Sequence, residues 1–598
     1  MKRTKEEKRP QSSMSIIWFF LKPYKLRIVV LFILAVLVGG LEAATIAAIY
    51  PILGQAFGAE AGGSIVSTVL GAIANLLPIA DEFIAFSVLF LLFAIFTFIV
   101  KLIAVKFSVN LSATLVRKNQ SEVYSRFIRA DYQYFIDHKQ GELIYNVATA
   151  PQHLAGLVNA ITQLTSQAIL SISVLLLLFS LSWQGTLAVL AIGVGYFFFN
   201  RYLGKKVTYY AAKGELEAGQ ESNVLLNESI TGIKQVKVFA AGEHWIDRFN
   251  GVVKRLWYHH SRRAVWAQIP TIALMLILYL VLGAAALIIK VIAPASFAEL
   301  IPALGTFALA IFRLFHIMGG VGGLIMSIMG ALPSCEAVYA IRSDTLTHLE
   351  DGEKELDAFK SNVEFNNVSF AYKGRAPVLK DVSITFEKGK TTAIVGRSGV
   401  GKTTFINLLL RFFDVDGGEI RIDGSNIKEY KLSSWLNKIG FVSQDTFIFN
   451  DSAKNNITFR SEEYSDEELI KAAKYADAHS FITELPEGYD TIVGDKGMRL
   501  SGGQAQRIAV ARAMLREPEI LIFDEATNAL DSISEEAVQN AINEISKEHT
   551  VIIIAHRLST IANADKIIVL EDGQIVEEGK HKELMQKRGT YWELYENM

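Results

Sequence analysis

A glycine-rich string near residue 400 has the residue types and spacing of a phosphate-binding loop. Residues 396–404 read Gly-Arg-Ser-Gly-Val-Gly-Lys-Thr-Thr, which matches the pattern GxxxxGK followed by Ser or Thr. Glycine lets the backbone wrap tightly, so N–H groups and a helix N-terminus can point at phosphate oxygens. A strand-like run at 391–395 precedes the string and a helix-like pattern at 405–411 follows it, as this motif requires. We therefore expect a nucleoside triphosphate to bind here.

Two side chains of this string have specific chemistry. Lys402 supplies a positive charge for the β- and γ-phosphates, and the Thr403 hydroxyl can ligate Mg²⁺. The predicted nucleotide-binding residues of the loop are Gly396, Arg397, Ser398, Gly399, Gly401, Lys402, Thr403 and Thr404.

A pair of acids follows a second strand-like run, Ile520–Phe523. An aspartate at the carboxyl end of a strand, here Asp524, can hold Mg²⁺ through water. The adjacent Glu525 can polarise the attacking water as a general base. Two neighbouring acids alone are most often a solvated surface pair, but four apolar residues directly before them favour the catalytic interpretation.

The most specific motif is Leu500-Ser501-Gly502-Gly503-Gln504, which resembles the signature motif of ABC-transporter nucleotide-binding domains. From about residue 362 to its end the chain resembles such a domain. These domains form head-to-tail dimers, so the resemblance implies that the signature of one copy caps the γ-phosphate of ATP held by the other. Ser501 offers a hydroxyl, and Gly502 and Gly503 allow close backbone approach near a helix start.

Four further positions are similar to functional residues of that family. Tyr372 resembles the aromatic residue that stacks on adenine, and Gln444 the glutamine that meets Mg²⁺ and the attacking water. Asp531 resembles a residue that communicates across the dimer, and His556 the histidine that contacts the γ-phosphate. The resemblance thus implies Glu525, His556 and Gln444 as catalytic residues, and ATP with Mg²⁺ as cofactors. It also implies Thr403, Gln444 and Asp524 as metal ligands, partly through water.

The first half of the chain has the composition of a membrane domain, which would attach the nucleotide site to a membrane. Of 598 residues 51% are apolar, the net charge is -2, and the long apolar runs lie almost entirely in residues 1–340. The near-neutral balance gives a nucleic-acid partner little support. Cys335 is the only cysteine, so no intrachain disulfide forms.

A membrane-spanning helix needs about 20 apolar residues. Six candidates occur, at 28–53, 83–105, 157–182, 186–203, 269–292 and 300–332.

The placement of lysine and arginine predicts the orientation of these spans. The stretch 54–82 has neither residue type, whereas the connections 106–153 and 201–268 are rich in both. Both termini are therefore expected in the cytoplasm. The two basic connections have helical patterns, which predicts membrane helices that continue far beyond the bilayer. A small separate domain remains the alternative.

Glu42 and Arg313 are charged and lie within the predicted spans, and His316 lies near Arg313. Charge inside a membrane is costly, so such residues usually face a partner or a watery cavity. One interpretation is the wall of a substrate cavity that meets a polar or anionic group. The other is a structural ion pair or side chains that reach towards the interface.

The resemblance extends over the whole chain. A short apolar segment at Ser12–Leu21 fits an interfacial helix, and Ile65, Val69, Ile73 and Leu76 repeat at helical spacing on the opposite side. Together with the six spans these segments resemble ABC exporters with domain-swapped intracellular loops. Leu41-Glu42-Ala43, Tyr50-Pro51-Ile52 and residues 310–314 resemble lipid-linked oligosaccharide flippases and, more distantly, lipid A flippases.

The predicted fold class is a six-helix transmembrane bundle with long cytoplasmic helical hairpins, followed by an α/β P-loop ATPase domain. The predicted boundaries are 1–27 for a tail and interfacial helix, 28–340 for the transmembrane domain, 341–361 for a linker and 362–598 for the nucleotide-binding domain. The resemblance implies a half-exporter of the cytoplasmic (inner) membrane that works as a homodimer, with a heterodimer left open.

The expected function is ATP-driven export or flipping of an amphipathic substrate, a polar lipid or lipid-linked oligosaccharide. A multidrug or peptide exporter is the alternative. An ATP-gated channel or a regulatory ATPase is the alternative from another class.

Overall fold

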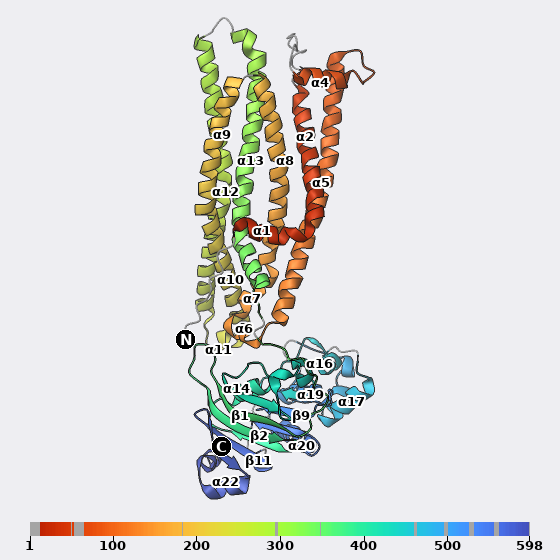
Figure 1. Cartoon of the computed structure of the whole chain (residues 1–598), viewed down its shortest axis with the longest axis vertical. Helices are drawn as coiled ribbons and strands as arrows, with labels where there is room; N and C mark the ends of the chain where they lie inside the picture. The colour runs from red at the N-terminus through yellow and green to blue at the C-terminus, as the bar shows by residue number, and fades with distance from the viewer. Residues whose placement is uncertain are drawn as a thin grey trace. The chain divides into compact units, whose positions relative to one another are not determined.

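The computed structural model describes residues 12–49, 51–52, 65–181, 183–292, 297–346, 349–459, 463–494, 500–525, 532–554 and 561–596 (Figure 1). The chain divides into two compact units. The first is Met1–Ala130 with Tyr134–Leu346, and the second is Asp131–Gln133 with Thr347–Met598. We refer to them as the membrane unit and the ATPase unit.

The membrane unit is helical throughout its described residues (Figure 1). Its long helices are α2 (Lys25–Ala47), α5 (Glu82–Ile128), α8 (His153–Leu181), α9 (Trp183–Leu203), α10 (Tyr210–Thr231), α12 (Gly242–Ile292) and α13 (Phe297–Ser343). Its short helices are α1 (Ser13–Leu21), α4 (Ile65–Ala74), α6 (Tyr132–Asp137, which begins within the three residues of the ATPase unit), α7 (Gln140–Ala148) and α11 (Ile233–Val238). A π-helical segment, Gly204–Tyr209, joins α9 to α10.

The long helices fit a transmembrane bundle. Within the described residues, five helical stretches are long and apolar enough to cross a membrane: Ser13–Ala47, Glu82–Ile128, Gln140–Leu176, Gly242–Val281 and Ile311–Ser343. The remaining predicted span, 186–203, corresponds to α9, whose apolar stretch Leu190–Phe199 is shorter.

Helices α5, α12 and α13 have 47, 51 and 47 residues, more than twice the length that a bilayer requires. The predicted extension of membrane helices beyond the bilayer is therefore confirmed. The two basic connections form helices of the bundle itself, apart from Asp131–Gln133, and not a small separate domain.

Helix α1 is fixed to the membrane unit by aromatic packing. The Ser12 side chain accepts a hydrogen bond from Ser15 N and caps the helix. The rings of Phe19 and Tyr339 meet edge to face at 4.9 Å, and the Arg342 guanidinium lies 5.0 Å from the Phe19 ring. The short helix predicted before the first span is present, with its buried side anchored to the end of α13.

The ATPase unit contains two main sheets (Figure 1). The antiparallel sheet has the order β2-β1-β4-β5, with β1 at Asn362–Phe370, β2 at Leu379–Glu387, β4 at Gly417–Ile422 and β5 at Ser425–Asn426. The second sheet has the order β12-β11-β3-β10-β9-β6, and all its pairs are parallel except β11 with β12. Its strands are β3 (Thr391–Val395), β6 (Ile439–Val442), β9 (Ile520–Asp524), β10 (Thr550–Ile554), β11 (Lys566–Glu571) and β12 (Gln574–Gly579).

The α-helices described in this unit are α14 (Lys402–Leu409), α15 (Leu432–Leu436), α16 (Ala453–Thr458), α17 (Asp466–Tyr475), α18 (His479–Thr483), α19 (Gly502–Met514), α20 (Ser532–Ile545), α22 (His581–Lys587) and α23 (Thr590–Glu596). Of these, α15 and α19 contact β6 of the parallel sheet, and α22 and α23 contact β12. A two-stranded sheet pairs β7 (Asp451–Ser452) with β8 (Ile492–Val493). Every residue of β3, β9 and β10 is buried, so these strands form the rigid centre of the unit.

Candidate functional site

The glycine-rich loop connects β3 to α14, as its sequence predicts. Gly401 directly precedes the helix with φ 109°, a conformation that residues with a Cβ rarely adopt. A Cβ there would also lie 3.0 Å from Leu379 and 3.1 Å from Val378. The loop therefore requires glycine at this position for both its turn and its close packing, and it leaves the N-terminus of α14 facing the loop.

The Lys402 ammonium lies over the loop. Its Nζ donates to the carbonyl oxygens of Gly396 at 2.8 Å and Arg397 at 3.2 Å. Burial lowers the pKa of Lys402, and the nearby carboxylates of Glu525 and Asp524 oppose that shift. The arrangement puts one cation where phosphates held by the loop would lie.

The two acids lie at the carboxyl end of β9, which pairs in parallel with both β6 and β10. Burial and, to a lesser extent, the adjacent Glu525 together raise the pKa of Asp524 to about 6, although the positive charge of Lys402 opposes the shift. Gln444, two residues beyond the end of β6, donates from Nε2 to Glu525 Oε2 at 2.6 Å. Because parallel neighbours end at the same sheet edge, residues 81 positions apart are brought together.

These oxygen donors fit a Mg²⁺ ion. Asp524 is almost fully buried beside a second carboxylate, so a cation there would relieve like-charge repulsion. Carboxylate, hydroxyl and amide oxygens are hard ligands of the kind that Mg²⁺ prefers. Asp524, the Thr403 hydroxyl and the Gln444 amide are the candidate residues to hold it.

Tyr372 packs beside this loop. Its hydroxyl is 3.1 Å from Thr404 Oγ1, and Asn407 Nδ2 donates to it at 3.4 Å. Its ring meets Phe413 and Phe370 edge to face at 5.4 and 5.1 Å. The residue is only half-buried, so part of the ring stays open for a base to stack against.

The signature residues form the start of α19. Ser501 caps the helix: its Oγ accepts from Gln504 N at 3.2 Å, and Gln504 Oε1 accepts from Ser501 N at 2.9 Å. Ser501 and Gly502 are exposed, whereas Gly503 is buried. The N-terminus of this 13-residue helix thus presents the Ser501 side chain and the backbone of Gly502 to solvent, which suits an anion.

Two predicted residues, His556 and Asp531, lie outside the described residues. The described strand before His556 is β10, which lies between β3 and β9 in the sheet. The roles expected for both residues stay predictions.

The membrane unit has a cavity of about 580 Å³. Its wall includes all three predicted residues, Glu42, Arg313 and His316. The complete lining is Val38, Glu42, Lys101, Ala104, Val105, Ser108, Val109, Asn159, Thr162, Gln163, Ser166, Gln167, Leu170, Arg313, His316, Ile317 and Gly320.

Within this cavity Glu42 bridges two cations from different helices. Its carboxylate accepts from Lys101 Nζ at 3.0 Å and from Arg313 Nη2 at 3.4 Å. Both sequence interpretations of these charges therefore have support, because the same residues form an ion pair and line a cavity. Sequence reasoning missed Lys101, although it lies inside the predicted span 83–105, one residue beyond a charge-free run.

Uncharged polar side chains of α5 and α8 line part of the remaining wall, and apolar residues such as Val38, Val105 and Leu170 line the other part. Ser108 Oγ donates to Asn159 Oδ1 at 2.8 Å. Gln167 Oε1 is buried without a hydrogen-bond partner. The wall therefore combines charge with amides and hydroxyls, and it retains unused hydrogen-bonding capacity.

Comparison with known proteins decides the family. The family model described as ABC transporter matches residues 379–528, and the model for the ABC transporter transmembrane region matches residues 28–329. The chain belongs to the ABC transporter family.

This ABC exporter has curated relatives in bacteria. It is 35% identical over 495 residues to the heterocyst differentiation ATP-binding protein HepA of Nostoc sp., covering 81% of this chain and 79% of the relative. It is 33% identical over 492 residues to the ATP-dependent lipid A-core flippase of Escherichia coli K12, covering 81% and 83%. A solved structure of a bacterial Atm1-family ABC exporter with ATP bound matches with TM-score 0.77 and 27% identity, covering 96% of this chain and 98% of the other.

These matches establish an integral membrane ABC exporter that binds ATP and couples its hydrolysis to transport. The transmembrane helical region followed by an ATPase domain, predicted from the sequence, is confirmed.

Proposed function

We propose that this exporter moves an amphipathic substrate with an anionic, hydroxyl-rich head group, a polar lipid or lipid-linked oligosaccharide, across the cytoplasmic membrane. The single observation that carries this proposal is the cavity in which Lys101 and Arg313 share one carboxylate, Glu42.

The charge balance of the cavity favours an anion. Two cations face one carboxylate there, and His316 lines the same wall. The Arg313 side chain is 41% exposed, so its guanidinium remains accessible although it is paired. Arginine binds phosphate or carboxylate oxygens through parallel hydrogen bonds. An anionic group that enters the cavity would therefore gain a partner without displacing apolar packing.

The neutral part of the wall favours hydroxyl groups. Asn159, Gln163 and Gln167 offer both donors and acceptors, and Ser108, Thr162 and Ser166 add hydroxyls. Such a surface hydrogen-bonds sugars, whereas a cavity for apolar drugs needs few polar groups. The lipid A-core flippase among the relatives is named for a substrate of this kind.

In the ATPase unit we assign roles from the site geometry and the family resemblance. The loop around Lys402 would hold the phosphates, and Thr403 with Asp524 would hold Mg²⁺, which would neutralise charge on the transferring phosphoryl group. Glu525 accepts the proton of the attacking water, Gln444 orients that water, and His556 contacts the γ-phosphate. Tyr372 stacks on adenine.

The working form is a homodimer with both termini in the cytoplasm. Ser501 to Gln504 of one copy act on ATP held by the other copy, and Asp531 communicates across the dimer, so the two copies together complete two active sites. ATP drives the dimer between inward- and outward-open states because it binds one of them more tightly.

Reconstitution tests the substrate. The exporter is placed in liposomes, and ATPase activity is measured with phosphorylated lipid-linked sugars, anionic lipids, neutral glycolipids, peptides and cationic drugs. We expect stimulation by the phosphorylated lipid-linked sugars above all. Stimulation by cationic drugs or peptides alone would favour the multidrug or peptide exporter. ATP-gated ion current without substrate movement would favour a channel.

A matched pair of variants connects the stimulation to the cavity. Lys101→Gln removes a cavity cation, whereas Lys106→Gln removes an exposed lysine of the same helix that does not line the cavity. We expect the first to raise the half-stimulating concentration about threefold, because Arg313 remains in the cavity to bind the anion. Equal behaviour of the two variants would contradict the cavity assignment.

A further inference from the structure

The segment that follows α13 in the chain is folded onto the ATPase unit. Leu356 and Phe359 are buried in the core that also contains β1 and β2. Leu356 N donates to Ser434 Oγ at 3.1 Å. Residues 357–361, which we call the linker strap, are thus an ordered part of this unit and not a loose tether.

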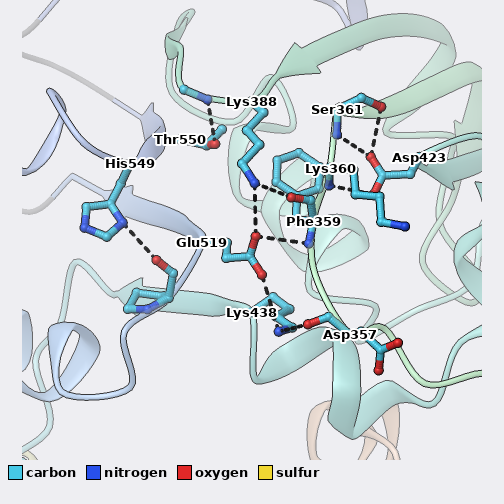
Figure 2. Close-up of polar contacts among 12 residues, drawn as sticks. Asp357, Phe359, Lys360, Ser361, Lys388, Asp423, Lys438, Glu519, His549 and Thr550 are labelled. Atoms are coloured by element: carbon cyan, nitrogen blue, oxygen red, sulfur yellow. Dashed lines mark hydrogen bonds and ion pairs between the residues drawn. The ribbon is translucent and has the colours of Figure 1, made fainter.

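Figure 2 shows the polar contacts of the linker strap. The Glu519 carboxylate accepts from Phe359 N at 3.0 Å and from Lys388 Nζ at 3.3 Å through Oε2. Its other oxygen pairs with Lys438 Nζ at 3.3 Å. Lys388 also donates to the carbonyl oxygen of Phe359, and Lys438 to that of Asp357. Glu519 and the two lysines therefore hydrogen-bond to a backbone N–H group and to two backbone carbonyl oxygens of the strap.

A second carboxylate holds the other end of the strap. Asp423 accepts from the backbone N–H groups of Lys360 at 2.8 Å and Ser361 at 2.6 Å, and from Ser361 Oγ at 2.9 Å (Figure 2). It also accepts from Asn362 N at 3.1 Å. Hydrogen bonds to an ionised carboxylate are about twice as strong as neutral ones. The strap is therefore fixed at both ends.

Glu519 and its two lysine partners all lie shortly before the first residue of a strand of the parallel sheet. Glu519 immediately precedes β9, Lys438 immediately precedes β6, and Lys388 lies three residues before β3. Their backbones are joined directly, because Glu519 N and Ile520 N both donate to Lys438 O, at 2.9 and 3.0 Å. Thr550, the first residue of β10, accepts from Gly389 N through its Oγ1 at 2.9 Å.

The opposite ends of the same strands carry the nucleotide site. After β3 comes the phosphate-binding loop, and after β6 comes Gln444. Strand β9 ends at Asp524, and Glu525, which contacts Gln444, follows it directly. The strands have four or five residues, about 13–17 Å, and most are buried on both faces. Packed strands of this length move as rigid rods, because a close-packed interior transmits displacement.

We propose that Glu519 is a positioning residue that couples the linker strap to the nucleotide site through β3, β6 and β9. The nucleotide state shifts these strands at their carboxyl ends, and Glu519 with Lys388 and Lys438 passes the shift to the strap at their amino ends. The proposal rests on the assigned nucleotide site but not on the substrate.

Hydrogen exchange of the full chain tests this coupling. The protein is placed in nanodiscs of phosphatidylethanolamine and phosphatidylglycerol, and exchange of peptides that contain 357–361 is measured by mass spectrometry. The two states are nucleotide-free and trapped with Mg-ATP and vanadate. In the wild type we expect slow exchange that changes at least about fivefold between the states. Identical exchange in both states would overturn the proposal.

The variant Glu519→Gln should release the strap. We expect exchange at 357–361 to be at least about tenfold faster in both states, because a charge-assisted bond is lost, and the nucleotide response to vanish. Glu517→Gln is the matched control, since Glu517 lies two residues upstream and pairs with Lys471 at 3.3 Å. It should change neither quantity.

Kinetics separate coupling from mere stability. Glu519→Gln should lower kcat for ATP several-fold and leave KM within about twofold, because no contact of the phosphate loop changes. Glu519→Asp, which keeps the charge, should restore most of kcat. A released strap with wild-type kcat would show that the contacts of Glu519 with the strap are structural only and would refute the proposal. If Glu519→Gln does not yield folded protein, Lys438→Met provides the same measurements with the Glu519 to Phe359 bond retained.

Discussion

The two units assemble their candidate sites in different ways. In the ATPase unit the residues come from contiguous motifs placed at the carboxyl ends of neighbouring parallel strands, so each group has a separate position and task. In the membrane unit single residues from different helices meet in one cavity and share their charges. A residue with its own task has no substitute, whereas members of a shared charge cluster partly replace one another. Single substitutions should therefore be far more damaging in the ATPase unit.

The largest loss of activity is expected when Glu525 is replaced. Glu525→Gln keeps the size of the side chain but removes its ability to accept a proton, so turnover should fall about 100-fold or more. ATP binding should remain, because Lys402 and the loop are intact. Phosphate release and binding of a fluorescent ATP analogue measure the two properties. Undiminished turnover would remove Glu525 from its proposed role.

Lys402→Met should have the next largest effect, this time on binding. The substitution removes the cation that lies over the loop at the carbonyl oxygens of Gly396 and Arg397. We expect ATP affinity to fall about tenfold or more, as the loss of a charge-assisted contact predicts. Equilibrium titration with the same fluorescent analogue tests it, and an unchanged Kd would argue against the assigned phosphate site.

Glu42→Gln should have a moderate effect and, unlike the two variants above, should increase the response to substrate. Neutralising Glu42 frees Lys101 and Arg313 to bind an anion, so an anionic amphiphile should stimulate ATPase activity at about threefold to tenfold lower concentration. Basal activity should change little. A dose–response curve in liposomes checks this. A collapse of expression or stability instead would mean that Glu42 serves only as a structural partner.

Asp423→Asn should have the smallest effect, and that effect should depend on pH. Burial raises the pKa of Asp423, but hydrogen bonds from Lys360, Ser361 and Asn362 outweigh it, so the net pKa is lowered. A carboxyl with a depressed pKa stabilises the fold above its unfolded pKa, near 4, and loses this contribution as pH falls through the folded value. The difference in Tm between wild type and variant should thus be largest near neutral pH and shrink in acid. A pH-independent difference would mean that charge is not involved.

Much of the ATPase site could be predicted from the sequence because its motifs are local. The glycine at 401 and the lysine at 402 follow a strand and start a helix, and this order alone defines a phosphate loop. The acids at 524 and 525 needed only the apolar run before them. Hydropathy predicted the membrane helices for the same reason, since apolar length is a property of one segment.

The tertiary structure alone decided which distant residues meet. Glu42 lies 59 residues from Lys101 and 271 from Arg313, and Phe359 lies 160 residues from Glu519. A helix turns its side chains by about 100° per residue, so such meetings depend on helix rotation and packing that no local pattern contains. Local sequence patterns were therefore enough to identify the two kinds of unit and the nucleotide loop. The shared charges of the cavity and the contacts of Glu519 with the linker strap exist only once the chain is packed.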